Sequence, residues 1–239
     1  MARRIRSAAM AMFVLAASPA FAGDFAERAV IGFSPDGSHF GFEEFGVQDG
    51  SGFPYANVYV IDVDRDAWVD DSPKQSLIRH EDATVEDARG EARQQARFLV
   101  QQYDLSHAGT IVASRLYTDE SADPYKIVFR PRSTSLKSDA PMMLTLDQYK
   151  LEDKPLCKDV GGSDSKGFRL TLTSDGASRV LHEDKRLPSS RTCPLEYRIH
   201  DVVTYYPEGA APVLVIIIQM LRVGFEGPDG RFLAVTTRF

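Results

Sequence analysis

The stretch VIGFSPDGSHFGFEEF at residues 30–45 decides the expected fold, because two apolar segments flank the dipeptide Asp36-Gly37. Asp-Gly supplies the positive backbone angle that a tight turn between antiparallel strands requires. The next apolar segment, YANVYVIDV at residues 55–63, alternates in the manner of a half-buried strand and ends in a polar turn. Together these segments predict an antiparallel sheet that begins with a hairpin.

Three further stretches repeat the order of apolar segment, glycine turn and apolar segment, at residues 103–117, 169–184 and 222–239. The turn glycines of the four stretches are Gly37, Gly109, Gly176 and Gly230. When a helix is subtracted from the first interval, the spacing approaches about fifty residues, the size of a four-stranded blade in a repeat fold. We therefore expect a mainly β fold of about four propeller-like hairpin repeats. A β-sandwich is the alternative, because Asp-Gly hairpins recur in any antiparallel protein.

One helix is expected within this β fold, near residues 84–103. Apolar side chains recur there at intervals of three and four, which places them on one helical face: Val85, Ala88, Ala92, Ala96, Leu99 and Tyr103. Thr84 followed by Asp87 resembles a capping box, which marks a helix start. By contrast, VLVIIIQML at residues 213–221 is apolar on both faces, so we expect a central strand that is covered on both sides.

The first 22 residues have the three parts of a secretory signal. Arginines at positions 3, 4 and 6 precede an apolar run at residues 8–17, and an A-x-A triplet ends at Ala22. The run is about half the length that a membrane-spanning helix needs. We expect cleavage between Ala22 and Gly23, which leaves residues 23–239 as a single mainly β domain in the periplasm or outside the cell, with no membrane span.

Charge and cysteine content restrict the partners and the compartment. Removing the signal takes away three arginines and no acidic residue, so the net charge of −6 becomes −9. Nucleic acids and anionic membrane surfaces require clustered basic residues, so we expect neither as a partner. The two cysteines, Cys157 and Cys193, predict a disulfide in an oxidising compartment.

Two resemblances support parts of this interpretation. IGFSPDGSHFGF followed by VYVIDVD resembles the blade signature of TolB-type β-propellers, well over residues 31–64 and partly over residues 223–235. Nearly the whole mature chain is also similar to a family of predicted secreted bacterial proteins of unknown function. That similarity is carried by GFEEFGVQDGSGFPYANVYVID at residues 41–62, SSRTCP at residues 189–194 and FEGPDGRF at residues 225–232. It implies no activity and no catalytic residue.

The segment at residues 45–55, FGVQDGSGFPY, is the candidate binding loop. Loops on a rigid scaffold often carry binding residues, and aromatic side chains provide rigid contact area. Phe53 and Tyr55 are the candidate anchors, and Glu43, Glu44 and Asp49 add negative charge. The alternative is that the aromatic side chains turn inward and cap the core.

The sequence therefore favours a non-enzymatic binding or scaffold protein of the cell envelope, whose partner is an envelope protein or a small ligand. The alternative is an envelope hydrolase whose site is assembled from distant acids and histidines, such as Glu43, Glu44 and His200. The five histidines are scattered and form no metal-ligand motif, so no catalytic residue, metal or cofactor is predicted.

Overall fold

The computed structural model describes residues 23–80, 82–132, 139–151, 157 and 165–239. The predicted signal peptide, including Ala22, lies outside the described residues, and Gly23 is the first described one. The described part is mainly β, with thirteen strands in three antiparallel sheets and one helix. Mainly antiparallel β structure with one helix is what the sequence predicts.

The first sheet has the order β1-β2-β3-β4, and β5 also pairs with β3. Its strands are β1 (Glu27–Phe33), β2 (His39–Val47), β3 (Pro54–Asp62), β4 (Ala67–Trp68) and β5 (Lys74–Leu77). The central sheet has the order β13-β12-β11-β6. Its strands are β13 (Pro228–Arg238), β12 (Val213–Val223), β11 (Pro194–Tyr205) and β6 (Thr110–Ser114).

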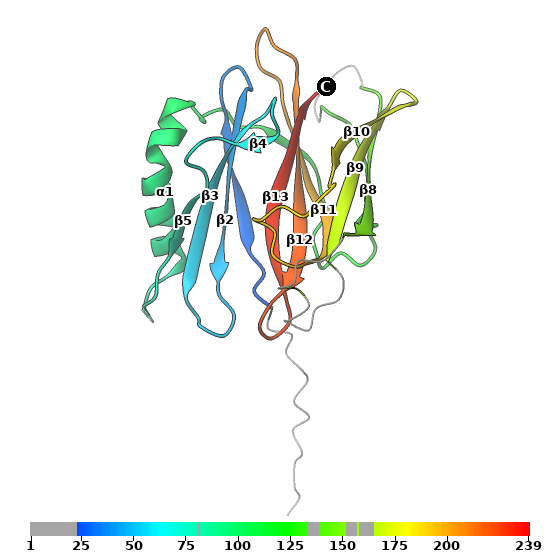
Figure 1. Cartoon of the computed structure of the whole chain (residues 1–239). Helices are drawn as coiled ribbons and strands as arrows, with labels where there is room; N and C mark the ends of the chain where they lie inside the picture. The colour runs from blue at the N-terminus through cyan, green and yellow to red at the C-terminus, as the bar shows by residue number, and fades with distance from the viewer. Residues whose placement is uncertain (1–22, 81, 133–138, 152–156, 158–164) are drawn as a thin grey trace, which may run out of the picture.

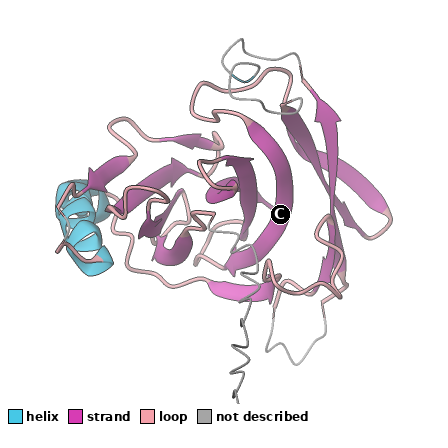
Figure 2. Ribbon diagram, turned by 90° about the horizontal axis from the view of Figure 1, so that it is seen from below, coloured by secondary structure: helices cyan, strands magenta, loops and turns pink. Residues whose placement is uncertain are grey.

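The third sheet has the order β10-β9-β8-β7. Its strands are β10 (Ala177–Glu183), β9 (Lys166–Ser174), β8 (Met142–Lys150) and β7 (Lys126–Phe129). The helix, α1 (Val85–Gln102), lies on the outer side of the first sheet. Helix, first sheet, central sheet and third sheet follow one another across the molecule, as Figures 1 and 2 show.

Strand β12 explains the stacking of the three sheets. Its side chains alternate between two cores: Val213, Val215 and Ile217 pack against the first sheet, and Leu214, Ile216, Ile218 and Met220 pack against the third. Successive side chains of a strand point to opposite faces, so a strand that is apolar at every position needs cover on both sides. The prediction of a doubly covered central strand is confirmed.

The helix begins and ends where the sequence predicts. Thr84 is the N-cap and forms a capping box with Asp87, and Tyr103 is the C-cap. The helix buries Ala88, Ala92 and Ala96 against β2 and β3 of the first sheet. Because alanine side chains are small, the helix backbone lies close to the sheet.

The propeller expectation is wrong for the described residues, which form stacked sheets arranged like a sandwich. A blade is built from strands that follow one another along the chain, whereas the central sheet joins β6 to β11–β13 from far along the sequence. Three of the four hairpins exist, as β1–β2, β9–β10 and β12–β13. Residues 103–117 instead lead from the helix end into β6, and Gly230 lies within β13 rather than at a turn. The glycine turns that do form hairpins therefore mark separate hairpins and not the blades of a repeat.

The predicted disulfide between Cys157 and Cys193 is present, with 5.5 Å between the two Cα atoms. It links the chain beyond β8 to the residue that precedes β11. In the described part of the chain, no helix is long and apolar enough to cross a membrane.

Candidate functional site

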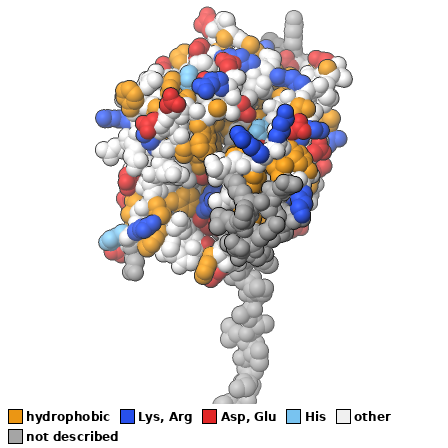
Figure 3. All heavy atoms as spheres, viewed as in Figure 1, with side chains coloured by type: hydrophobic (Ala, Val, Ile, Leu, Met, Phe, Trp, Pro, Cys, Tyr) orange, Lys and Arg blue, Asp and Glu red, His pale blue; other side chains and the backbone are white. Residues whose placement is uncertain are grey.

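A cleft of about 820 Å³ opens between the first sheet and the edge of the central sheet. One wall is formed by the inward side chains of β2 to β5, and the other by β13, the end of β12 and residues 188–191. Strand β13 is the edge strand of the central sheet, so no further strand of that sheet covers this side. Figure 3 shows the face of the molecule in the view of Figure 1, with apolar side chains lying among basic ones.

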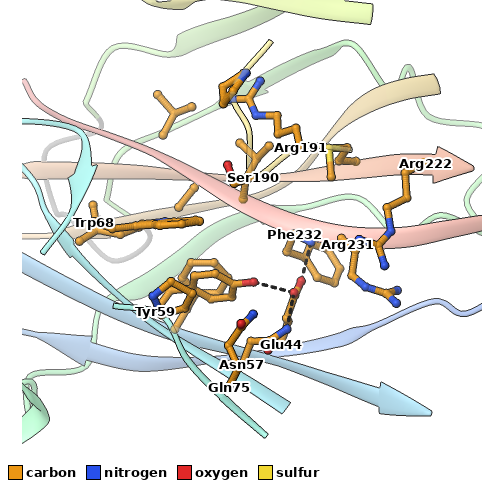
Figure 4. A pocket seen from close by; sticks show the side chains of 18 of the residues that line it. Glu44, Asn57, Tyr59, Trp68, Gln75, Ser190, Arg191, Arg222, Arg231 and Phe232 are labelled. Carbon is orange, nitrogen blue, oxygen red and sulfur yellow. Dashed lines mark hydrogen bonds between the residues drawn. The ribbon is translucent and has the colours of Figure 1, made fainter. Parts of the chain in front are cut away.

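Aromatic side chains form a row along the first wall. The rings of Phe42 and Tyr59 stack with centroids 4.8 Å apart, and Trp68 lies 5.6 Å beyond Tyr59 at a tilted angle. Phe42 and Tyr59 are buried, whereas Trp68 is 45% exposed. The row thus begins at buried rings and ends at the partly exposed ring of Trp68. Figure 4 shows Tyr59 and Trp68 on this wall of the cleft.

Glu44 on β2 is the buried acid of the cleft, with 2% of its surface exposed. Its Oε1 accepts hydrogen bonds from the Tyr59 hydroxyl at 2.7 Å and from Asn57 Nδ2 at 3.0 Å. Its Oε2 accepts the backbone N–H of Phe232 on β13 at 2.8 Å. Burial raises the pKa of Tyr59 well above its usual value, and the adjacent Glu44 carboxylate adds to the effect, so Tyr59 stays a donor.

Three arginines line the opposite side, and each is paired with an aspartate. Arg231 contacts Asp24 at 2.5 Å, Arg191 contacts Asp184 at 2.6 Å, and Arg222 contacts Asp229 at 3.4 Å. The charge of these guanidinium groups is therefore balanced within the protein.

Two carboxylates cover the edge of β13 that faces the cleft. Glu44 accepts the N–H of Phe232, and Asp66 Oδ1 accepts the N–H of Thr236 at 2.7 Å. In an antiparallel sheet, alternate residues of an edge strand direct their N–H groups away from the neighbouring strand. Side chains thus satisfy two of the donors that an added strand would use.

His182 on β10 lies at the far end of the cleft, between two acids. Its Nε2 is 2.9 Å from Asp184 Oδ1, and its Nδ1 is 3.7 Å from Asp66 Oδ2. Burial alone would lower the pKa of His182, but the hydrogen bond to Asp184 and the nearby Asp66 carboxylate outweigh burial and raise the pKa above its ordinary value. His182 therefore links the third sheet to the turn between β3 and β4.

The structure separates the five residues of the predicted binding set. Glu44 and Tyr55 line the cleft, and both are buried. Glu43 points to the other face of β2 and contacts the helix. Asp49 accepts a hydrogen bond from the backbone N–H of Glu226 in the β12–β13 turn. Phe53, in the same loop as Asp49, is half-buried.

The interpretation that the aromatic side chains cap the core describes most of this loop. Phe45 packs in the core beneath the helix, with the Arg89 guanidinium 3.9 Å above its ring. Tyr55 packs between the first and central sheets, and its hydroxyl donates to Asp24 Oδ1 at 2.8 Å. Phe53 is the one aromatic side chain of this loop that retains a partly exposed surface.

The residues suggested for a hydrolase do not gather into one site. Glu43 and Glu44 are consecutive on a strand, so their side chains lie on opposite faces of the first sheet. His200 is buried on β11, 3.1 Å from Asp201 and edge-on to Phe232. Among the described residues, no group of three or more His, Cys, Asp or Glu side chains could hold a metal ion.

Sequence reasoning missed Trp68, Asn57 and Asp66 as cleft residues. The available signal was Trp68, the only tryptophan of the chain, placed in a polar turn after a strand. A tryptophan provides a large apolar surface with one polar N–H group, which is why it is common at binding interfaces. Arg191 and Arg231 carried no local signal, because distant segments bring them to the cleft.

Fold and cleft together define a layered antiparallel β protein that carries a cleft of about 820 Å³ at the edge of its central sheet. A family model described as Predicted secreted protein (DUF2259) matches residues 41–238, so the chain belongs to that family. The protein is periplasmic or secreted, as its N-terminal sequence predicts. Neither the search of curated proteins nor the search of solved structures found a match.

Proposed function

We propose that this protein is an exported, non-enzymatic binding protein that holds a small organic molecule in the cleft between its first and central sheets. The observation that carries the proposal is the position of Trp68, a large and partly exposed aromatic side chain at the opening of a cleft lined by polar groups. Ligand sites combine apolar area with a few oriented polar groups, usually in volumes of about 300–1,000 Å³. The cleft has both properties.

The charged side chains of the cleft support binding rather than catalysis, because each is already held by contacts within the protein. The three arginines are paired with aspartates, and Glu44 receives three hydrogen bonds from uncharged donors. These contacts hold the side chains in fixed positions, which reduces the ordering cost of binding. Covalent catalysis usually requires a nucleophile that a neighbouring base activates. The proposed binding function requires no such pair.

Fluorescence of Trp68 tests the proposal directly, because no other tryptophan contributes to the signal. The mature protein is titrated with a library of neutral, cationic and anionic small molecules, and thermal stability is followed in parallel. A ligand that binds only the native state raises the melting temperature in a concentration-dependent manner, and a ligand that contacts Trp68 also changes its emission.

Phe98→Ala serves as the matched control variant, since Phe98 is an exposed aromatic residue on the helix, away from the cleft. We expect Trp68→Ala to lose the thermal shift and Phe98→Ala to keep it. A library in which no compound changes either signal would contradict the binding proposal.

A further inference from the structure

The charges around the cleft indicate the net charge of its ligand. An anion would need a cation whose charge is not already balanced, but Arg191, Arg222 and Arg231 each contact an aspartate. A cation would need a carboxylate that the protein does not already use, but Glu44 accepts three hydrogen bonds and Asp66 accepts the backbone N–H of Thr236. A charged ligand would therefore displace existing ion pairs, whereas a neutral one leaves them intact.

The polar groups that a ligand can reach are uncharged amides and hydroxyls, together with the Glu44 carboxylate, which already accepts hydrogen bonds. The amides of Asn57 and Gln75 occupy paired positions on β3 and β5 and face the cleft, and each amide both donates and accepts hydrogen bonds. Described residues use three of the roughly four acceptor positions of the Glu44 carboxylate, which leaves room for one hydroxyl donor. Ser190 lies on the opposite wall. Such a set matches a ligand with several hydroxyl groups.

The aromatic row provides the complementary apolar surface. Trp68 exposes 45% of its surface at the end of the Phe42–Tyr59–Trp68 row. The face of an aromatic ring carries partial negative charge, so it attracts the weakly positive C–H groups of a flat aliphatic ring. A sugar ring has one such C–H face and a rim of hydroxyl groups.

The edge of β13 argues against an extended peptide as the occupant. A peptide that added a strand here would need the N–H groups of Phe232 and Thr236, which Glu44 and Asp66 already accept. Between them, Ala234 directs its N–H to the same side by the two-residue period of the strand. The single N–H group of Ala234 can donate to a ligand hydroxyl, but it cannot provide the series of hydrogen bonds that an added strand needs.

We infer that the cleft binds a neutral saccharide of one or two rings, with a ring stacked on Trp68 and hydroxyl groups bonded to Glu44, Asn57 and Gln75. This inference rests on the proposed binding function and specifies its ligand class. Recognition then depends on ring stacking and on hydrogen bonds to these three polar side chains. Figure 4 shows Glu44 between Tyr59 and Phe232, with Asn57 and Gln75 beside it.

The experiment uses the mature protein and a defined set of probes at millimolar concentration. The saccharide probes are methyl glucoside, maltose, cellobiose and N,N′-diacetylchitobiose. The comparison probes are inorganic phosphate, tetramethylammonium and the neutral tripeptide Gly-Phe-Gly amide with an acetylated N-terminus. For each probe, the melting temperature is measured in the wild type and in Trp68→Ala, Gln75→Ala and Phe98→Ala. Trp68 fluorescence is measured in the three proteins that retain the tryptophan.

We expect at least one saccharide to shift the emission of Trp68 and to raise the melting temperature of the wild type and of Phe98→Ala. Trp68→Ala should lose the thermal shift, and Gln75→Ala should weaken the saccharide affinity about tenfold, the effect of one lost hydrogen bond to a bound ligand. Gln75 is exposed, so its replacement should leave the fold intact.

Four results would overturn the inference. If only phosphate, tetramethylammonium or the peptide binds with the same dependence on Trp68, the cleft is a binding site for another ligand class and the proposed function stands. If saccharides bind equally well to Trp68→Ala, they bind elsewhere. If no saccharide binds while another compound of the wider library does, the ligand class is wrong, and a wholly inactive library would remove the proposed function as well.

Discussion

Glu43 and Glu44 are consecutive residues of β2, both almost completely buried, yet their surroundings differ in kind. Glu43 faces the helix and is paired with Arg89 and Arg93, each with an Nη2 at 2.5 Å from its Oε1. Glu44 faces the cleft, and its hydrogen-bond donors are a hydroxyl, an amide and a backbone N–H. The first acid joins two elements by charge pairing, whereas the second holds its carboxyl group at the wall of a cleft through hydrogen bonds.

The largest expected effect tests whether the face of the first sheet that bears Glu44 is packed as tightly as the face that contacts the helix. Tyr55 shares that face, is 5% exposed and bonds to Asp24. Tyr55→Ala should lower the free energy of unfolding by about 3–5 kcal/mol, because it opens a cavity in the core. The melting temperature should fall by roughly 10 °C in a protein of this size, as measured by circular dichroism.

Phe53→Ala is the matched control for Tyr55→Ala, since Phe53 is only half-buried in the same loop. Its effect on stability should be clearly smaller. Equal and small losses in both variants would mean that the loop at residues 45–55 is loosely packed and available as a contact surface.

The second prediction concerns the charge pairing on the helix face. Glu43→Ala leaves Arg89 beneath the helix without its main partner, and breaking a buried ion pair costs about 3 kcal/mol or more. Arg93→Ala should cost less than about 1 kcal/mol, because the Arg93 side chain is half exposed. Urea unfolding of both variants measures the difference. A loss for Glu43→Ala no greater than that for Arg93→Ala would refute the assignment.

The third prediction tests the hydrogen bonds on the cleft face. Glu44→Gln keeps the volume but replaces one acceptor oxygen by a donor, so a buried donor among Tyr59, Asn57 and the Phe232 N–H loses its partner. We expect a loss of about 1–3 kcal/mol in the free energy of unfolding. Ligand affinity should fall as well, which Glu43→Gln should not cause. Wild-type affinity in Glu44→Gln would place the ligand away from this carboxylate.

The smallest effect is the pH dependence that His182 contributes at the end of the cleft. Its pKa in the folded protein is raised, so its contribution to stability is complete below the unfolded-state pKa of about 6.5 and is lost as the pH rises through the folded-state pKa. Hydrogen bonding to His182 and the Arg191 charge lower the pKa of Asp184 despite its burial, so the contribution of Asp184 is lost only in acid.

His182→Gln should therefore flatten the decline in unfolding free energy that begins as the pH rises above about 6.5. Urea unfolding at a series of pH values measures that slope. His80→Gln is the control, because His80 is exposed and lies in the loop that precedes the helix. An unchanged slope in His182→Gln would show that the pairing with Asp184 and Asp66 does not depend on protonation.

Sequence patterns predicted local elements well and their assembly poorly. The capping pair Thr84 and Asp87 and the helical period located the helix to within a residue at each end. The same reasoning took Asp-Gly turns for a repeat, because a turn motif reports its own backbone angles and not the sheet that its strands join. Strand β6 pairs with β11 across a long stretch of chain, and no local signal encodes that pairing.

By itself, the sequence determined export, the disulfide, the helix and the doubly covered strand β12, because each depends on a short pattern of charge, thiols or apolar spacing. Only the tertiary structure decided the cleft. One wall comes from β2 to β5, and the other comes from β13 and residues 188–191, more than a hundred residues further along the chain. It also decided that Glu43 faces the helix and Glu44 the cleft. Alternation along a strand separates the two side chains, but which face meets which neighbour depends on how the sheets stack.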